Sequence, residues 1–276
     1  LLVNWRDNPW FPDELNQERL WDFDNLPRAL YDHIWEGKFN DSVENGLIMA
    51  EWFDACIDAH IKLGFGTHGI KKVTHDPSDV GNDPKAIALR EGNVFTQVKE
   101  RDDLDVNDGC DWATGYAIEV GADQFEYDVG GMGTGLKRQV NESLNGKRVE
   151  VFMFNGASTA DMADAIYQPA MGENIQEQKT NKEMFKNLRA QCYASVRDRV
   201  YKTYKAVVQG KMCDPEDLIS FSSGIDNLSK LRSELCRMPI KPNGSGLFEL
   251  YTKEQMRKMF KVSSPNLADC VMMSER

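Results

Sequence analysis

The stretch that decides the fold is residues 70–98, which read IKKVTHDPSDVGNDPKAIALREGNVFTQV. It contains three short runs of apolar and β-branched residues, separated by Asn, Asp, Gly and Pro. These runs are Ile70–His75, Ala86–Arg90 and Val94–Val98. Such runs, bounded by turn residues, are typical of sequential strands with hairpin-like connections. We therefore predict that this stretch forms the first three strands of a sheet.

Outward from these strands, helical and extended patterns alternate along the chain. Apolar residues recur three and four positions apart in Cys110–Val120, which predicts a helix. The other predicted elements are helices over Leu26–Trp35, Ala50–Leu63 and Lys182–Val208, strands over Ala122–Tyr127 and Val149–Phe154, a helix ending near Leu144 and a last helix from Ser264. Strands interleaved with helices favour an α/β fold with a mixed central sheet and helices on its faces.

The composition argues against several classes of protein. The 276 residues carry 33 basic and 44 acidic side chains, and a net charge of -11 argues against a surface that binds nucleic acid everywhere. The six cysteines are widely spaced and the four histidines are scattered, so we expect neither a zinc site nor disulfides. We expect no membrane partner and no signal peptide, because long apolar runs are missing. Reduced thiols are typical of a cytosolic compartment.

Three aspartates occupy positions where a sheet can gather carboxylates. Asp76 follows the first predicted strand, Asp128 ends the strand before a glycine-rich loop, and Asp269 lies one turn into the last helix. Hard divalent cations prefer such oxygen ligands. Two cations about 4 Å apart can activate water and stabilise the leaving oxygen in phosphodiester hydrolysis. The alternative is structural, because Asp is common at strand ends as a turn residue and in the first turn of helices.

Two glycine motifs raise the question of nucleotide binding. The loop Gly131–Gly135 lies between a strand and a helix, but Leu136 stands where the third glycine of G-x-G-x-x-G belongs. A turn that leads into a helix is the preferred interpretation. Gly146–Lys147 and Gly210–Lys211 lack the Ser or Thr that follows Lys in a Walker A motif, so we expect no ATPase activity.

Basic residues fall near one stripe of the predicted helix over 182–208. They are Lys182, Lys186, Arg189 and Arg197. The stripe could contact the phosphates of duplex DNA. A solvated helix face is the other interpretation, and we prefer it.

Several motifs, in their order along the chain, resemble the large terminase subunits of headful-packaging, short-tailed phages. These motifs are HDPSD at 75–79, GCDWAT at 109–114, AIE at 117–119, GAD at 121–123 and SPNLAD at 264–269. The opening, with VNW at 3–5, DNP at 7–9 and LYDHIW at 30–35, is similar too. The interval from Asp76 to Asp128 also matches these relatives. The resemblance covers nearly the whole chain.

This resemblance implies a ribonuclease-H-like fold and Mg²⁺ or Mn²⁺, as two ions, at a carboxylate cluster. Asp76, Asp128 and Asp269 fall on the three metal-binding positions of the family. Asp79 is implied as a helper beside these ligands. Lys253 matches a family lysine whose ammonium lies near the metal centre, and its alternative role is that of an ordinary surface lysine at a helix start.

Relatives carry a P-loop ATPase domain ahead of the segment that begins here. The resemblance therefore implies that residues 1–45 form a helical connector from such a motor and that 46–276 form the nuclease domain. The implied partners are double-stranded DNA, the terminase small subunit, the portal protein and the ATPase domain. The implied location is the cytoplasm of the host cell.

Together these observations predict a metal-dependent DNA endonuclease that cuts concatemeric viral duplex DNA during genome packaging, by two-metal hydrolysis. Three alternatives remain open. One is a related ribonuclease-H-like nuclease such as a junction resolvase, against which the segment Asp7–Pro9 argues. The second is a non-catalytic module that docks on the motor or the portal. The third is a dinucleotide-binding enzyme.

Overall fold

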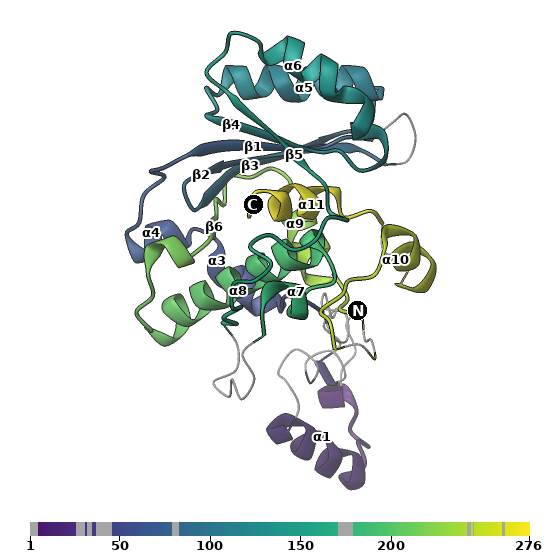
Figure 1. The fold of residues 1–276 in the computed structure, drawn as a ribbon. Coiled ribbons are helices and arrows are strands. Elements are labelled where there is room, and N and C mark those ends of the chain that lie inside the picture. Colours follow the sequence, from purple (N-terminus) through teal and green to yellow (C-terminus); the bar gives the residue numbers. More distant parts are fainter. Residues whose placement is uncertain are drawn as a thin grey trace.

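A six-stranded mixed sheet forms the centre of the protein, as Figure 1 shows. The structure is a computed structural model that describes residues 5–25, 31, 35–36, 46–78, 83–170, 179–241, 244, 246–260 and 263–276. The strands are β1 (Lys71–Asp76), β2 (Lys85–Glu91), β3 (Val94–Arg101), β4 (Gln124–Asp128), β5 (Glu150–Phe154) and β6 (Ser220–Phe221). Their order across the sheet is β5-β4-β1-β2-β3-β6.

The direction of the strands divides the sheet into two parts. The three runs predicted as strands within residues 70–98 form β1, β2 and β3, which pair antiparallel. On the other side of β1, strands β4 and β5 are added in parallel. Parallel neighbours require crossover connections, and α5 (Val106–Glu119) and α6 (Lys137–Leu144) provide them. This order and these directions confirm the predicted ribonuclease-H-like fold.

Helices α5 and α6 lie side by side over one face of the sheet (Figure 1). Side chains of the strands, such as Val73 and Phe125, pack there against Cys110 and Ala117 of α5. The helix begins at Val106, four residues earlier than its apolar stripe, because the Asp105 side chain accepts hydrogen bonds from two backbone N–H groups of the first turn.

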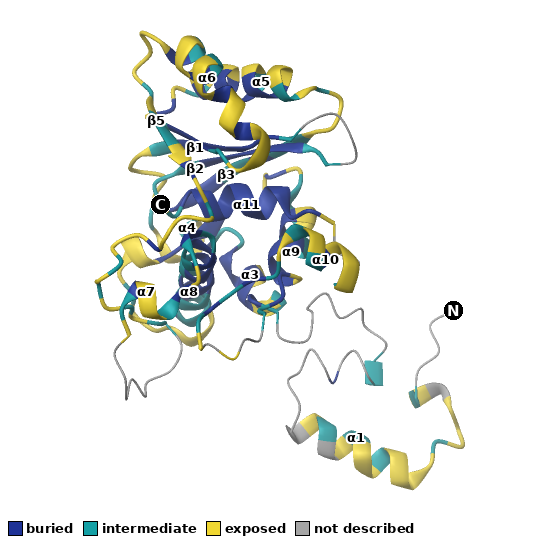
Figure 2. Cartoon of the chain, turned by 45° about the vertical axis from the view of Figure 1, so that its right-hand side comes forward, coloured by how far each residue is buried: buried dark blue, intermediate teal, exposed yellow. Residues whose placement is uncertain are grey.

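The opposite face of the sheet carries a larger group of helices (Figures 1 and 2). They include α3 (Ala50–Cys56), α8 (Leu188–Gln209), α9 (Leu228–Cys236) and α11 (Asn266–Met273). Helix α11 packs against the sheet and is buried along its whole length, as Figure 2 shows. Each buried aliphatic side chain contributes roughly 1.5–3 kcal/mol, so α11 is firmly placed between the sheet and the other helices.

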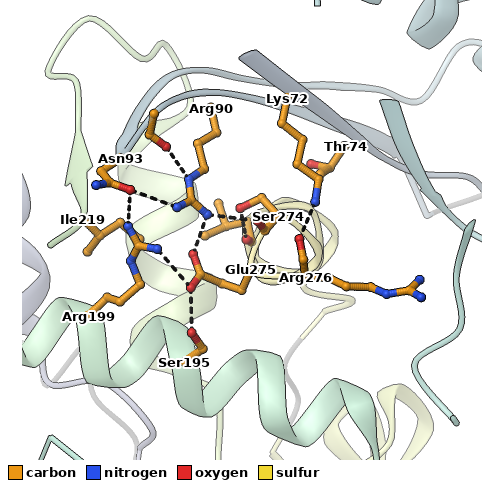
Figure 3. A network of polar contacts seen from close by, with 12 residues as sticks. Lys72, Thr74, Arg90, Asn93, Ser195, Arg199, Ile219, Ser274, Glu275 and Arg276 are labelled. Atoms are coloured by element: carbon orange, nitrogen blue, oxygen red, sulfur yellow. Dashed lines mark hydrogen bonds and ion pairs between the residues drawn. The ribbon is translucent and has the colours of Figure 1, made fainter. Parts of the chain in front are cut away.

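A polar network also holds the end of α11 (Figure 3). The buried Glu275 carboxylate accepts hydrogen bonds from Arg90 Nη1 at 2.8 Å and from Ser195 Oγ at 2.7 Å. Arg199 Nη1 lies 3.5 Å from the same carboxylate. A buried carboxylate is expensive to leave unpaired. The network therefore ties α11 to β2 and α8 and limits its movement along the sheet.

Two predicted helices are interrupted in the structure. The helix predicted over Lys182–Val208 is in fact α7 (Asn181–Met184) and α8, because Phe185 leaves the helix to form a β-bridge with Phe248. Asn187 then caps α8 by accepting a hydrogen bond from the Ala190 N–H at 3.0 Å. The helix predicted over 50–63 is likewise divided into α3 and α4 (Ala59–Leu63), because Ile57 bridges to Phe221 of the short strand β6.

The remaining described elements are η1 (Trp5–Asp7), α1 (Asp13–Asn25), η2 (Gly131–Leu136), η3 (Pro215–Asp217) and α10 (Lys253–Phe260). Helix α1 lies away from the sheet (Figure 1). Most of the helix predicted over Leu26–Trp35 lies outside the described residues, and the division of the chain at residue 45 stays a prediction. Within the described part, each helix is too short or too polar to cross a membrane.

Candidate metal and catalytic centre

The carboxyl ends of β1 and β4 lie at the same edge of the sheet because these strands are parallel neighbours. Asp76 is the last residue of β1, and Asp128 is the last residue of β4. Helix α11 packs against β1 and brings Asp269 to this edge. Each of the three carboxylates is close enough to another to alter its ionisation. The structure thus brings the three predicted aspartates together.

Lys253, the first residue of α10, lies between two of these aspartates. Its Nζ is 3.0 Å from Asp76 Oδ2 and 3.0 Å from Asp269 Oδ2. The Lys253 side chain is 39% exposed, whereas those of Asp76 and Asp269 are only 7% and 8% exposed. The lysine therefore reaches inward from the surface and neutralises a pair of buried carboxylates. An ordinary surface lysine would not make these contacts.

The second oxygen of Asp269 has partners of its own. Tyr193 OH donates a hydrogen bond to Asp269 Oδ1 at 2.7 Å, and Arg189 Nη2 lies 3.4 Å from the same oxygen. Both partners come from the first three turns of α8. The two oxygens of Asp269 are thus engaged by different elements, Oδ1 by α8 and Oδ2 by α10.

Asp128 leads directly into the glycine-rich turn. Its Oδ1 accepts a hydrogen bond from the Gly130 N–H at 2.7 Å. A Cβ atom at Gly133 would lie only 1.7 Å from the Asp128 carbonyl oxygen, so no larger residue fits there. Gly131 has a φ of 57°, in the left-handed region that favours glycine. The turn after Asp128 accounts for these two glycines.

Burial and charge act in opposite directions on these groups. Burial raises the pKa of Asp76, and although Lys253 lowers it, the neighbouring Asp269 and Asp128 raise it further. Burial also raises the pKa of Asp128. For Asp269, burial alone would raise the pKa, but Lys253, Arg189 and the Tyr193 hydrogen bond together bring it below its usual value. Of this pair of buried carboxylates, Asp269 therefore holds its negative charge more readily than Asp76.

The donors at this edge suit a divalent cation once two side chains move. Among the described residues, no three His, Cys, Asp or Glu side chains lie close enough to hold one metal ion. The Lys253 ammonium already stands between Asp76 and Asp269, and Asp128 is hydrogen-bonded to its own turn. That ammonium is a stand-in cation held by carboxylate oxygens, which are the donors that hard divalent cations prefer. The residues therefore fit such an ion if Lys253 withdraws and Asp128 turns.

Two further polar residues hold the start of α11. Glu234 of α9 accepts a hydrogen bond from the Ala268 N–H at 3.0 Å, immediately before Asp269. Burial raises the pKa of Glu234 to about 8, although the Ala268 hydrogen bond lowers it. Asn266 Nδ2 donates to the Pro84 carbonyl at 2.8 Å, which links the helix to the segment that leads into β2. These contacts fix the helix that carries Asp269.

The other predicted site residues are not all at this edge. Asp79 lies outside the described residues. Arg189 contacts Asp269, as described above. Lys182 and Lys186 are exposed on or near α7, and Lys182 Nζ lies 2.5 Å from Asp164 Oδ1.

Arg197 corrects the prediction of a single basic stripe. This residue is only 7% exposed, and its Nη2 lies 2.8 Å from Asp198 Oδ1. Its guanidinium also lies over the ring of Phe248, 5.3 Å from the centroid. Arg197 thus faces the protein interior, and the break between α7 and α8 separates the two lysines from the arginines. The four side chains do not share one exposed helix face.

Sequence reasoning missed Tyr193, Glu234 and Asn266. Asn266 stands in the motif SPNLAD, so its nearness to Asp269 could have been noticed. Tyr193 and Glu234 lie inside amphipathic helices, where the apolar spacing indicates burial but not a polar partner. Only the packing of α8 and α9 against α11 shows their contacts.

Comparison with known proteins adds an independent observation. No protein-family model and no curated protein matches the chain. The chain is similar to the solved nuclease domain of the large terminase subunit gp2 of bacterial virus Sf6, with 41% identity and a TM-score of 0.78 over 84% of this chain and 98% of that chain.

Mutant forms of the same domain give similar matches. A lysine-to-alanine mutant solved with manganese and beta-thujaplicinol has 41% identity and a TM-score of 0.78, over 84% of this chain and 98% of that chain. A mutant solved with calcium has 40% identity and a TM-score of 0.77, over 84% of this chain and 99% of that chain.

Proposed function

The chain belongs to the family of nuclease domains of phage large terminase subunits, and from this premise we propose that it is a metal-dependent endonuclease that cuts concatemeric viral duplex DNA during genome packaging. The observation that carries the proposal is the meeting of Asp76, Asp128 and Asp269 at one edge of a ribonuclease-H-like sheet, with Lys253 between two of them. Four ionisable groups gathered in this way raise or lower one another's pKa, and such groups are concentrated at functional sites.

The carboxylates would hold two divalent cations, magnesium or manganese, in place of the Lys253 ammonium. The similar mutant structures were solved with manganese and with calcium. When bound, such ions supply charge that polarises the scissile phosphate and activates an attacking water. Asp76 would hold a cation through its carboxylate, and a cation there would lower the pKa that burial raises. Asp269 is already charged and presents Oδ2 to the same space.

Lys253 and Arg189 act on charge at the same edge. Without metal ions, Lys253 compensates the buried carboxylates and keeps them from repelling each other. With cations neutralising the carboxylates instead, the Lys253 ammonium would be free to contact a DNA phosphate. Arg189 stays against Asp269, where its position on α8 supports the ligand. Phosphate contacts carry no base information, so we expect little sequence preference.

The proposal extends to the setting in which the domain works. A packaging nuclease has to act together with an ATPase motor, the terminase small subunit and the portal, in the cytoplasm of the host cell. These partners follow from the family and from the proposed reaction.

A plasmid-nicking assay tests the proposed reaction. Supercoiled plasmid is incubated with the protein in Mn²⁺, in Mg²⁺ and in EDTA. We expect nicked and linear products with the metal ions and none in EDTA. Asp269→Asn removes a ligand and should lower the cleavage rate by at least about 100-fold, beyond the 10–100-fold typical of residues around a ligand.

The matched control is Asp164→Asn, which makes the same chemical change at an exposed aspartate that pairs with Lys182. This control should cleave like the parent. Intact plasmid across a range of metal and protein concentrations, with protein that still melts cooperatively, would overturn the assignment as a nuclease.

A further inference from the structure

We propose that Tyr193 is a positioning residue of the metal centre, whose hydroxyl holds the Asp269 carboxylate so that Oδ2 faces the cation site. This inference rests on the proposed function, because it concerns how the same site binds divalent cations. Tyr193 is not expected to contact DNA or metal itself. It acts through Asp269.

The two oxygens of the Asp269 carboxylate have different partners. Tyr193 OH donates to Asp269 Oδ1 at 2.7 Å, while Asp269 Oδ2 lies 3.0 Å from the Lys253 ammonium. A carboxylate whose one oxygen is fixed by a donor cannot rotate freely about its side-chain bonds. Oδ2 is therefore directed to the position where a cation already stands.

The Tyr193 hydroxyl is a rigidly held donor. Tyr193 is 0% exposed and belongs to the main hydrophobic core, so its ring cannot turn the hydroxyl away. The Arg189 guanidinium lies over that ring, 5.0 Å from its centroid, and its Nη2 reaches the same Oδ1 at the longer distance of 3.4 Å. Of the two donors to Asp269 Oδ1, the Tyr193 hydroxyl thus lies at the shorter distance and is the more firmly held.

A hydrogen-bond donor beside a metal ligand affects the affinity of the site for metal. Groups that hydrogen-bond to metal ligands fix their orientation, and their loss typically lowers metal affinity or activity by about 10–100-fold. A purely structural hydrogen bond has a different signature. It stabilises the metal-free protein and leaves the metal concentration for half-saturation unchanged.

The experiment compares Tyr193→Phe with Tyr201→Phe. Both remove one phenol hydroxyl from α8, but the Tyr201 ring packs on Trp52, 4.7 Å from its centroid, in the contact between α3 and α8. Thermal melts in EDTA check folding, and melts over a Mn²⁺ series give the Mn²⁺ dissociation constant, because the stabilisation grows as RT ln(1 + [Mn²⁺]/Kd). In EDTA, we expect Tyr193→Phe to melt roughly 3–12 °C below the parent, because one hydrogen bond to a charged group is lost.

The decisive quantity is the Mn²⁺ dissociation constant. We expect it to rise by about 10-fold in Tyr193→Phe and to stay at the parental value in Tyr201→Phe. An unchanged dissociation constant in Tyr193→Phe, with a parent that responds to Mn²⁺, overturns the positioning role alone. A parent that gains no stability from Mn²⁺ overturns the metal site itself and the inference with it.

A measurement on the unaltered protein does not depend on the folding of a variant. The chain has 8 tyrosines, and labelling their Cζ atoms with ¹³C gives one NMR signal for each ring carbon beside a hydroxyl. Titration with Ca²⁺ should move one buried tyrosine signal with the same dissociation constant that the Ca²⁺-dependent melts give, because the hydrogen-bonded Asp269 changes its electrostatic surroundings. If all tyrosine signals stay in place through that titration, the proposal is wrong.

Discussion

At the scale of single residues, a substitution at Asp128 distinguishes two roles for this side chain, that of a metal ligand and that of a turn residue. Burial raises its pKa, so its charged form destabilises the fold above the pKa of the unfolded chain. Asp128→Asn removes that charge and keeps an oxygen that can accept the Gly130 hydrogen bond. In EDTA at pH 7, we expect the variant to be as stable as the parent or more stable.

The same variant should lose most of the stabilisation by Mn²⁺, because a ligand that binds only the native state stabilises it by mass action. Thermal melts of parent, Asp128→Asn and the control Asp164→Asn, in EDTA and in Mn²⁺, measure both effects. A purely structural Asp128 predicts the opposite pattern, an earlier melt in EDTA and equal metal shifts in all three proteins.

Lys253 gives a second prediction at this scale. Lys253→Met keeps most of the apolar stem but leaves Asp76 and Asp269 without the cation that lies 3.0 Å from each. Breaking a buried pair costs about 3–5 kcal/mol, and water around this partly exposed lysine reduces the loss, so we expect about 1–3 kcal/mol in EDTA. Mn²⁺ should restore that stability, and at a lower concentration than the parent needs, because no ammonium competes for the carboxylates.

Urea unfolding with and without Mn²⁺ measures these changes. Lys258→Met is the matched control, since Lys258 lies on the same helix but pairs with the exposed Glu254. The predicted competition between Lys253 and metal is contradicted if Lys253→Met unfolds like the parent in EDTA. It is also contradicted if the variant needs more Mn²⁺ than the parent for the same gain in stability.

At the scale of elements, Glu234 links α9 to the start of α11, and this contact carries a pH dependence. Burial raises the pKa of Glu234 to about 8, from 4.5. A carboxyl whose pKa is raised in the folded state makes the native protein bind its proton more tightly. Glu234 therefore stabilises the folded state at low pH, and this stabilisation is lost as the pH rises from about 4.5 to about 8.

Glu234→Gln removes this dependence, because glutamine does not ionise and can still accept the Ala268 hydrogen bond. Between pH 5 and pH 8 the parent should therefore lose stability relative to the variant, by an amount on the order of 2 kcal/mol. Urea unfolding in EDTA at several pH values measures the difference. The contributions of Asp76 and Asp128 to the pH dependence of stability cancel, because both proteins contain these residues. The exposed Glu142→Gln should follow the parent, and parallel curves for parent and Glu234→Gln would contradict the prediction.

The elements also show what local patterns can predict. Strands β1 to β3 follow from short apolar runs between turn residues, and helix α5 follows from apolar residues three and four positions apart, so neighbours in sequence are enough to indicate them. The prediction failed where a distant residue interrupts a helix. Phe185 pairs with Phe248 and Ile57 pairs with Phe221, and neither partner is close in sequence. Strand β6 has only two residues, too few for alternation to be recognised.

At the scale of the whole molecule, the site divides into a part that sequence could indicate and a part that it could not. Asp76, Asp128 and Asp269 stand at the ends or starts of elements, so the order of strands and helices suggests a common edge. The contacts of Tyr193 and Glu234 with α11 depend on how three helices pack on one face of the sheet. No pattern within a single helix carries that information.

The charge of the whole molecule leads to the last prediction, which concerns DNA. A net charge of -11 repels a polyanion at long range, so the attraction has to come from a few basic side chains near the catalytic edge. Lys253 and Arg257 on α10 and Lys137 after the glycine turn are candidates, and Lys137 and Arg257 are exposed. With about three phosphate contacts, the logarithm of the binding constant should fall with the logarithm of salt with a slope of about -3.

We therefore expect weak binding of duplex DNA in Ca²⁺, with a Kd in the range of about 10⁻⁴–10⁻⁶ M at physiological salt. Fluorescence anisotropy over a salt series measures the slope, and Lys137→Gln should reduce its magnitude by about 1. Lys211→Gln is the control, because Lys211 follows the far end of the 22-residue helix α8, roughly 30 Å from the end that carries Tyr193. Equal slopes for the parent and Lys137→Gln would mean that Lys137 contacts no phosphate and that the DNA does not pass the glycine-rich turn. Binding that stays tight at high salt would mean that contacts other than phosphates dominate, and the small set of edge cations would no longer explain how this acidic protein holds DNA.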